Sequence, residues 1–286
     1  MGKLYRRIKE QLAQTYDEGE SQTMAMMLLE GVANLSRTDV LMDRDDLLNP
    51  DEIAIFDSFL MRLERNEPIQ YVLGKAEFCG MTLSVDKNVL IPRPETEELV
   101  RVACLHEGKE SGKILDIGTG SGCIALALKR KYPKAEVEGW DINEDALRVA
   151  RKNADEIGEN VSFSCVDILK CEDENGNSVR TSGNEFDLIV SNPPYICNDE
   201  IEEMEKNVVD FEPHGALFVP NEKPLLFYEA ISRFARKALK TGGMLCFEIN
   251  RKYGNETAEL MKEEGFHDVS IETDQFGNER IVKGWK

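Results

Sequence analysis

The sequence lacks the residue groupings that usually mark a metal site or a disulfide framework. Its seven cysteines are an odd number without a CxxC pair or a regular spacing, which predicts reduced thiols. There are only three histidines, His106, His214 and His267, and none has a cysteine at ligand spacing. We therefore expect no metal in this protein.

The N-terminal segment lacks a continuous apolar core, because MGKLYRRIKEQLAQTY is charged and periodic. This argues against a signal peptide and a membrane span, and it favours a cytoplasmic protein with no membrane partner. Positive charge is scarce as well: 35 lysines and arginines stand against 54 acidic residues, for a formal net charge of -19. Such a charge repels phosphate backbones, so we expect no nucleic-acid partner.

The 286 residues are enough for a main domain and a smaller one, and the apolar periodicity divides them into three regions. Residues 1–72 show only helical spacing and predict a small helical bundle. Residues 73–93 predict a linker with a β-hairpin. Residues 94–286 alternate strand and helix patterns, which predicts a doubly wound, mostly parallel α/β domain. The polar, acidic segment 170–185 is predicted to be an exposed loop.

The segment LDIGTGSGCIA has the pattern of a buried strand, a glycine-rich turn and a helix. Such a turn lets the backbone approach a ligand closely. The spacing is G-x-G-x-G, and Cys123 stands where the dinucleotide fingerprint requires a third glycine, which disfavours a nicotinamide enzyme. The candidate cofactor-binding residues of this turn are Gly118, Thr119, Gly120, Ser121 and Gly122.

Three aspartates stand at or near the ends of successive predicted strands. Asp116, just before the glycines, suits a ligand with an ammonium group better than one with a phosphate. Asp141 is placed to accept both hydroxyls of an unphosphorylated ribose. Asp167 suits an adenine amino group, with Ile168 against the ring. Each acid alone fits a helix cap or a solvated strand end equally well, but together they indicate S-adenosylmethionine.

The segment SNPPY follows a strand of the same domain, so Asn192 is predicted to face the same crevice as the glycines. An asparagine oxygen and the carbonyl of Pro193 are two acceptors that can orient an NH2 group toward a methyl donor. The prolines hold that carbonyl because their φ angles are locked, and Tyr195 can stack on a planar group. The plain alternative is a turn, since Asn and Pro both favour turns.

Asp116-x-Gly118-x-Gly120-x-Gly122, with the acids downstream, resembles the Rossmann-like class I methyltransferases. Their sheet usually has seven strands, with the last one antiparallel. The N-P-P-Y tetrapeptide resembles that of enzymes that methylate planar NH2 groups in adenine, guanine or protein glutamine. Four further blocks are similar to the protein-(glutamine-N5) methyltransferases that act on class 1 peptide chain release factors. These blocks are EPIQYVLGKAEF, LIPRPETEELV, FEPHGALF and GNERIVKGW.

The resemblance implies methylation of the glutamine in the Gly-Gly-Gln motif of class 1 release factors, with S-adenosylmethionine as cofactor. It implies that Asn192 and Pro193 hold the glutamine amide and that Pro194 and Tyr195 shape its pocket. Arg93 and Glu95 are expected near that pocket, although a salt bridge made by the linker explains Arg93 equally well. The N-terminal bundle would recognise the substrate, residues 94–286 would form the methyltransferase domain, and we expect a monomer.

Three alternatives remain open from the sequence. The substrate could be a glutamine of a ribosomal protein or an exocyclic amine of a nucleic acid, or the chain could be a silent binding module on the same fold. Three features depart from the family pattern. Cys79 follows Phe78 where relatives often carry a second aromatic residue, Asn250 stands where glycine is frequent, and the acidic segment 170–185 is longer than expected. We interpret that segment as a steering surface for a basic protein partner.

Overall fold

The computed structural model describes residues 2–42, 50–105, 111–171 and 185–286. The chain packs as two compact units. The first is Met1–Lys75 with Glu205–Phe211, and the second is Ala76–Met204 with Glu212–Lys286. Most of the acidic segment predicted at 170–185 therefore lies outside the described residues, and its steering role stays a hypothesis.

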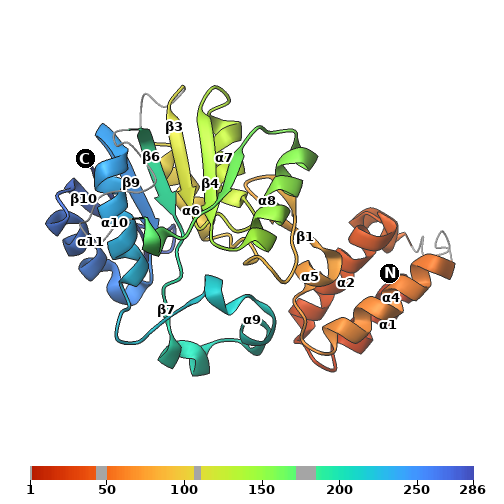
Figure 1. The fold of residues 1–286 in the computed structure, drawn as a ribbon. Coiled ribbons are helices and arrows are strands. Elements are labelled where there is room, and N and C mark those ends of the chain that lie inside the picture. Colours follow the sequence, from red (N-terminus) through yellow and green to blue (C-terminus); the bar gives the residue numbers. More distant parts are fainter. Residues whose placement is uncertain (1, 43–49, 106–110, 172–184) are drawn as a thin grey trace. The chain divides into compact units, whose positions relative to one another are not determined.

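The first unit consists of helices (Figure 1). Their bounds are α1 Lys3–Leu12, α2 Glu18–Ala33, α3 Arg37–Leu41, α4 Pro50–Leu63, α5 Ile69–Leu73 and α9 Lys206–Phe211. Ile8 and Leu12 recur at one helical turn and are fully buried against Leu28, Leu60 and Leu63, which form one apolar core. This confirms the predicted helical character of the N-terminal region.

The predicted hairpin lies at the start of the second unit, and in it β1 (Lys75–Phe78), whose first residue belongs to the first unit, pairs with β2 (Met81–Ser84). Its turn consists of Cys79 and Gly80, which both have positive φ values, 47° and 68°. Glycine accepts this backbone conformation without strain, whereas cysteine does not. The Cys79 N–H donates to the carboxylate of Glu97 at 2.7 Å, which helps to hold the turn.

A seven-stranded sheet forms the centre of this unit, with the strand order β10-β11-β9-β6-β3-β4-β5. The strands are β3 Lys113–Ile117, β4 Glu136–Asp141, β5 Ser162–Cys165, β6 Phe186–Ser191, β9 Leu239–Glu248, β10 His267–Thr273 and β11 Glu279–Trp285. Every pair is parallel except those of β11, which runs antiparallel to both neighbours. The predicted doubly wound sheet with an antiparallel last strand is confirmed.

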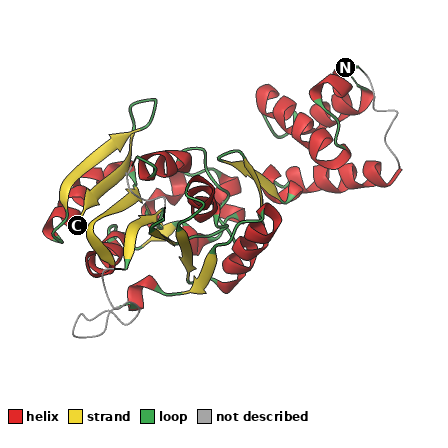
Figure 2. Cartoon of the chain, turned by 90° about the horizontal axis from the view of Figure 1, so that it is seen from above, coloured by secondary structure: helices red, strands yellow, loops and turns green. Residues whose placement is uncertain are grey.

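Helices cover both faces of the sheet (Figures 1 and 2). Ile114 and Val190 pack against one helical layer, and their neighbours Leu115 and Ile189 pack against the other, as the two-residue period of a strand requires. The first layer is α6 Thr96–Ala103, α7 Cys123–Lys131 and α8 Glu144–Ile157, and the second is α10 Leu226–Ala238 and α11 Gly254–Glu263. The sheet is thus buried on both faces.

The strand order reverses between β3 and β6. From β3 the chain proceeds to β4 and β5 on one side, and then returns to place β6 on the other side of β3. The carboxyl ends of β3 and β6 therefore flank the crevice where doubly wound folds bind ligands. Short elements follow the strands, namely η2 Ile168–Lys170, η3 Asn198–Glu203, η4 His214–Ala216 and η5 Arg251–Tyr253, together with the paired strands β7 Ile196–Cys197 and β8 Phe218–Val219.

Candidate active site

The glycine-rich turn connects β3 to α7 at this crevice. Gly118, Gly120 and Gly122 have φ values of 75°, 52° and 81°, in the left-handed region that favours glycine. The N–H groups of Gly118 and Thr119 donate to the carbonyl of Trp140 at 2.8 and 2.9 Å, which ties the turn to β4. A β-carbon on Gly120 would meet no atom within 4 Å. The turn therefore leaves open space beside its middle glycine.

Asp116 is completely buried near the end of β3. Its Oδ2 accepts from the Thr119 hydroxyl at 2.7 Å and from the Ala125 N–H at 3.2 Å. Its Oδ1 has no hydrogen-bond partner among the described residues. Burial raises the pKa of this carboxyl to about 7, and the two hydrogen bonds only partly oppose the effect. This buried acceptor atom is thus uncompensated within the described residues.

Asp141 ends β4 and contacts the glycine turn directly. Its Oδ2 accepts from the Gly120 N–H and its Oδ1 from the Asn143 N–H, both at 2.9 Å. Burial raises the pKa of Asp141, and these backbone N–H groups lower it. The next residue, Ile142, is 64% exposed. We did not select Ile142 from the sequence, although an apolar residue directly after a strand-end acid was a usable signal.

Asp167 lies beyond the end of β5 and caps η2. Its Oδ1 accepts from the Leu169 N–H at 3.1 Å, and its Oδ2 pairs with the Lys170 ammonium at 2.8 Å. Ile168 is half-buried and packs against the core layer of α10. Asp167 thus has the helix-capping role that the sequence left open. Its contact with adenine remains a prediction.

The segment SNPPY follows β6 and lies beside the glycine turn. The Ser191 hydroxyl donates to the Ile117 carbonyl at 2.6 Å, which joins the ends of β6 and β3. A β-carbon on Gly118 would lie 3.8 Å from the Asn192 carbonyl oxygen. The Asn192 amide nitrogen donates to the Thr96 hydroxyl at 3.2 Å. The structure therefore brings the two motifs together at the crevice.

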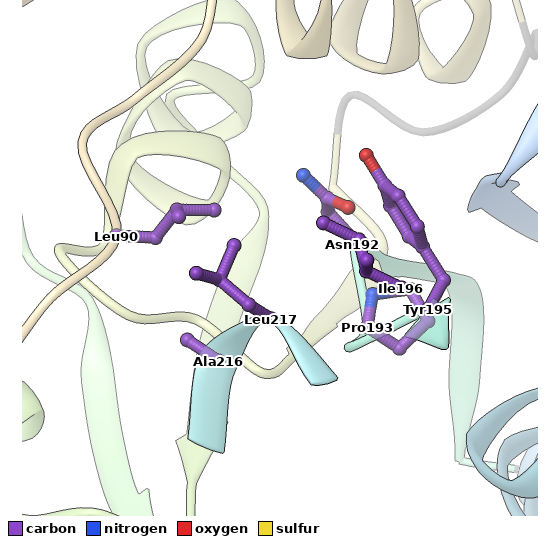
Figure 3. A pocket seen from close by; sticks show the side chains of 7 residues that line it. All are labelled: Leu90, Asn192, Pro193, Tyr195, Ile196, Ala216 and Leu217. Atoms are coloured by element: carbon purple, nitrogen blue, oxygen red, sulfur yellow. The ribbon is translucent and has the colours of Figure 1, made fainter. Parts of the chain in front are cut away.

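A pocket opens at this segment (Figure 3). It is lined by Leu90, Asn192, Pro193, Tyr195, Ile196, Ala216 and Leu217. The Asn192 amide and the Tyr195 ring extend in the same direction from the chain, and the N–H groups of Tyr195 and Ile196 donate to the Leu217 carbonyl at 3.2 and 2.9 Å. Both polar and apolar side chains thus line this pocket. Pro194 is half-buried beside them.

Arg93 lies at the end of the predicted linker, and Glu95 lies just beyond it. Arg93 forms an ion pair with Glu212, whose side chain is buried, and the second carboxylate oxygen of Glu212 accepts from the Ile91 N–H at 3.2 Å. The salt bridge that the sequence allowed for Arg93 is present. Glu95 is exposed at the start of α6. Substrate contact by Arg93 and Glu95 stays a prediction.

Glu248 is a residue of the site that we did not select from the sequence. It ends β9, is 3% exposed, and accepts from the Tyr195 hydroxyl at 3.3 Å. Burial raises its pKa, while hydrogen bonding by Thr96 and Tyr195 and the charge of Arg280 lower it. The only signal in the sequence was an acid at the end of an otherwise apolar strand, MLCFE.

Asn250, where the sequence departs from the family pattern, supports the same segment. Its amide nitrogen donates to the Tyr195 carbonyl at 3.2 Å and to the Glu200 carboxylate at 3.1 Å. A glycine has no side chain to make these bonds. The asparagine at this position therefore adds a hydrogen bond to the backbone of the SNPPY segment.

Two negative findings apply to the described part of the chain. No group of three or more His, Cys, Asp and Glu side chains in it is arranged to hold a metal ion. None of its helices combines the length and the apolar character that crossing a bilayer requires.

The sheet with its antiparallel last strand, the glycine turn after β3, and Asn-Pro-Pro-Tyr after β6 define a class I methyltransferase. Two family patterns match the chain, the Methyltransferase small domain over residues 98–211 and the PrmC N-terminal domain over residues 3–74. The chain belongs to the release factor glutamine methyltransferase family.

Relatives that bear this name align over nearly the whole chain. The protein from Bacteroides thetaiotaomicron is 40% identical over 99% of this chain and 99% of its own length. The protein from Flavobacterium psychrophilum is 41% identical over 95% of this chain and 94% of its own. Both are named release factor glutamine methyltransferase, and both extend through the two units.

Solved structures share the fold. The Thermus thermophilus 16S rRNA N2 G1207 methyltransferase, solved with AdoMet and guanosine, is 19% identical with a TM-score of 0.52. It covers 74% of this chain and 49% of its own. A methyltransferase from Pyrococcus furiosus is also 19% identical, with a TM-score of 0.50 over 80% of this chain and 98% of its own. At this identity the comparison supports the architecture alone.

Proposed function

We propose that this protein transfers a methyl group from S-adenosylmethionine to the side-chain amide nitrogen of the glutamine in the Gly-Gly-Gln motif of class 1 peptide chain release factors. The observation that carries the proposal is the meeting of Asn192 with the glycine turn at the strand switch point, in a chain that aligns from end to end with enzymes of this name. The assignment of each residue below belongs to the same proposal.

The crevice fits S-adenosylmethionine in three respects. The unpartnered Oδ1 of Asp116 is an acceptor for the ammonium group of the cofactor. The glycine turn leaves open space at Gly120, and the Asp141 carboxylate beside it would accept hydrogen bonds from the ribose hydroxyls. The exposed Ile142 and the half-buried Ile168 offer apolar contact for adenine, with Asp167 near its amino group. When bound, the cofactor supplies a methyl group on a positively charged sulfur, and S-adenosylhomocysteine is the product.

The substrate amide needs orientation more than activation. Its nitrogen lone pair is delocalised into the carbonyl group. The NH2 group must therefore be held in an orientation that directs this lone pair at the methyl carbon. The Asn192 side-chain oxygen and the Pro193 carbonyl accept the two hydrogens, and the Tyr195 ring stacks on the amide plane. Pro194 limits the movement of this segment because its φ angle is fixed. The nitrogen loses one proton as it gains the methyl, and water can accept that proton.

Recognition of a protein substrate requires more surface than the pocket offers. We assign it to the helical unit and to Arg93 and Glu95, because recognition of a protein partner buries far more surface than a single pocket provides. The net charge of -19 favours a basic protein surface over a nucleic acid. The protein would act as a monomer in the cytoplasm.

The test incubates the purified protein with S-adenosylmethionine and a class 1 release factor, and peptide mass spectrometry then locates any methyl group. We expect a gain of one methyl on the glutamine of the Gly-Gly-Gln motif, and no gain with Asn192→Ala. Binding of S-adenosylmethionine by the variant, measured by calorimetry, controls for correct folding. The absence of a methyl in a wild-type protein that binds the cofactor would refute the assignment and point to a ribosomal protein or a nucleic-acid amine.

A further inference from the structure

Asn153 is a fully buried amide on α8, and the proposed reaction assigns it no part. The other buried residues of this helix are alanine, leucine and valine, so its inner face is apolar with one polar exception. An amide in such a place costs free energy unless its polar atoms are hydrogen-bonded. The hydrogen bonds that compensate this cost show which parts of the chain the amide holds.

The Asn153 side chain forms three hydrogen bonds, all of them to backbone groups. Its Oδ1 accepts from the Ser84 N–H at 2.7 Å, and its Nδ2 donates to the Ser84 carbonyl at 3.0 Å. The same nitrogen donates to the Ser121 carbonyl at 2.9 Å. Both hydrogens of the NH2 group thus have an acceptor. One buried amide thereby joins the last residue of β2 to the glycine turn.

The bond to Ser121 supplies a donor that helix α7 does not provide. The helix begins after Gly122. A helical N–H donates to the carbonyl four residues earlier, so the N–H of Ala125 would bind Ser121 if the helix extended that far. It donates to the Asp116 carboxylate instead, at 3.2 Å. The Ser121 carbonyl obtains its donor from Asn153.

The peptide unit between Ser121 and Gly122 is consequently held at both ends. Its carbonyl accepts from Asn153, and its N–H, which belongs to Gly122, donates to the Thr119 carbonyl at 2.8 Å. Because a peptide unit is planar, hydrogen bonds at its two ends fix its rotation. The turn that surrounds the open space at Gly120 therefore depends on Asn153 for its shape.

The bonds to Ser84 tie the linker to the same amide. Ser84 ends β2, and the chain then continues to Leu90, which lines the pocket with Asn192. Asn153 pairs with both the N–H and the carbonyl of Ser84, as the backbone of a neighbouring strand would. The segment that leads to the pocket and the glycine turn thus share one buried anchor.

We infer that Asn153 is a positioning residue for the cofactor: it fixes the Ser121–Gly122 peptide of the glycine turn and, through Ser84, the strand from which the linker starts. The inference rests on the proposed function in one respect, namely that the glycine turn binds S-adenosylmethionine. Asn153 acts through the backbone that it binds and not by contact with a reacting group. Loss of the amide should therefore weaken cofactor binding more than it slows methyl transfer in the loaded enzyme.

The first test uses the wild-type protein. Nuclear magnetic resonance during a titration with S-adenosylhomocysteine follows the Asn153 side-chain NH2 and the Ser84 backbone N–H. We expect both signals to shift with the midpoint that calorimetry gives for the same ligand, because the ligand binds the turn that Asn153 holds. The side-chain NH2 of Asn255, which is exposed on α11, should keep its signal. Unchanged signals at Asn153 and Ser84 in the saturated protein would overturn the inference.

The second test replaces the amide by an apolar side chain of similar shape. Asn153→Leu suits the apolar face of α8 but leaves the Ser121 carbonyl without its donor. We expect the Kd for S-adenosylmethionine to rise about tenfold, since an unsatisfied buried acceptor has an effect of that order. In turnover on the release factor, the KM for the cofactor should rise in parallel while kcat stays within about threefold. An unchanged Kd would contradict the positioning role.

Thr257→Val is the matched control, because it also removes a buried hydrogen bond. The fully buried Thr257 hydroxyl, on α11, donates to the Tyr253 carbonyl at 2.8 Å. This variant should bind S-adenosylmethionine as the wild type does. An equal rise of the Kd in Thr257→Val and Asn153→Leu would indicate general loosening and overturn the inference.

Cofactor binding keeps the failure of this inference distinct from that of the proposed function. A wild type that binds S-adenosylmethionine but leaves the release factor unmethylated would refute the proposed function, while the titration and the Kd of Asn153→Leu would still decide the role of Asn153. An active wild type with the same Kd as Asn153→Leu would overturn the inference alone. A wild type that binds no cofactor would refute both.

Discussion

Asp116→Asn is the substitution whose effect the structure defines most sharply. The Asp116 carboxylate uses Oδ2 for both of its hydrogen bonds, so an asparagine oxygen can take over both. The new NH2 group then occupies the position of Oδ1, which has no partner among the described residues. The substitution therefore removes a buried ionisable group while it keeps the internal contacts of the site. We expect it to stabilise the free protein at alkaline pH.

The magnitude follows from the pKa of Asp116, which burial raises from 3.8 to about 7. Between these two values the folded protein holds a proton that the unfolded chain has released, so the free energy of unfolding falls as pH rises. The fall ends near pH 7, where the folded carboxyl also ionises. From pH 5 to pH 8 the wild type should lose about 3 kcal/mol at this residue, about two pKa units at 1.36 kcal/mol each. Asparagine does not titrate, so Asp116→Asn should gain that amount relative to the wild type.

The assay is urea unfolding of both proteins at pH 5 and pH 8, followed by tryptophan fluorescence. Both tryptophans, Trp140 and Trp285, lie in the second unit, so the signal reports the unit that contains Asp116. Any constant cost of the new NH2 group cancels in the difference between the two pH values. The same substitution at the exposed Asp155 should show no such difference. A gain for Asp116→Asn that is equal at pH 5 and pH 8 would refute the reasoning.

Two further substitutions test the glycine turn and the linker. Gly122→Ala should destabilise the second unit by about 2 kcal/mol in urea unfolding, because φ is 81° and the new β-carbon would lie 3.2 Å from Ala150 and Phe163. Gly158→Ala, with φ 78° but open space, should cost less, and an equal cost at both positions would contradict the role of crowding. Arg93→Gln should cost about 3 kcal/mol, because it leaves the buried Glu212 carboxylate without its ion pair. Recovery of that loss in Arg93→Gln, Glu212→Gln would support this explanation, and additive losses would exclude it.

The architecture and the meeting of the motifs were predictable because they depend on local pattern and on a general rule. Apolar strands alternating with helical periods imply a parallel sheet, and such a sheet gathers the residues that follow its strands at one edge. Gly118, Asp141 and Asn192 are therefore near neighbours although they are far apart in sequence. The helical first region was predictable from its four-residue spacing, since Ile8 and Leu12 bury one face.

The remaining features depend on contacts that no local pattern encodes. The assignment of Glu205–Phe211 to the helical unit arises from tertiary packing, although this segment follows SNPPY in sequence. Glu248 lies next to Asn192 only because β9 pairs with β6 in one particular register. Asp167 looks like Asp141 in sequence, yet it caps η2 while Asp141 accepts from Gly120. Residue type and position relative to a strand were not enough to distinguish these two acids.

Three buried carboxylates around the crevice differ in how many of their oxygens have a hydrogen-bond or ion-pair partner. This difference indicates what each one does. Glu212 has a close ion pair with Arg93 and a backbone donor, so it stabilises the linker. Asp116 and Glu248 each keep one oxygen without a partner in the described structure, and burial raises the pKa of both. Such incomplete compensation lowers the stability of the free protein. It is resolved at Asp116 if a cationic ligand donates to Oδ1. Ligand binding should therefore stabilise the wild type more than Asp116→Asn.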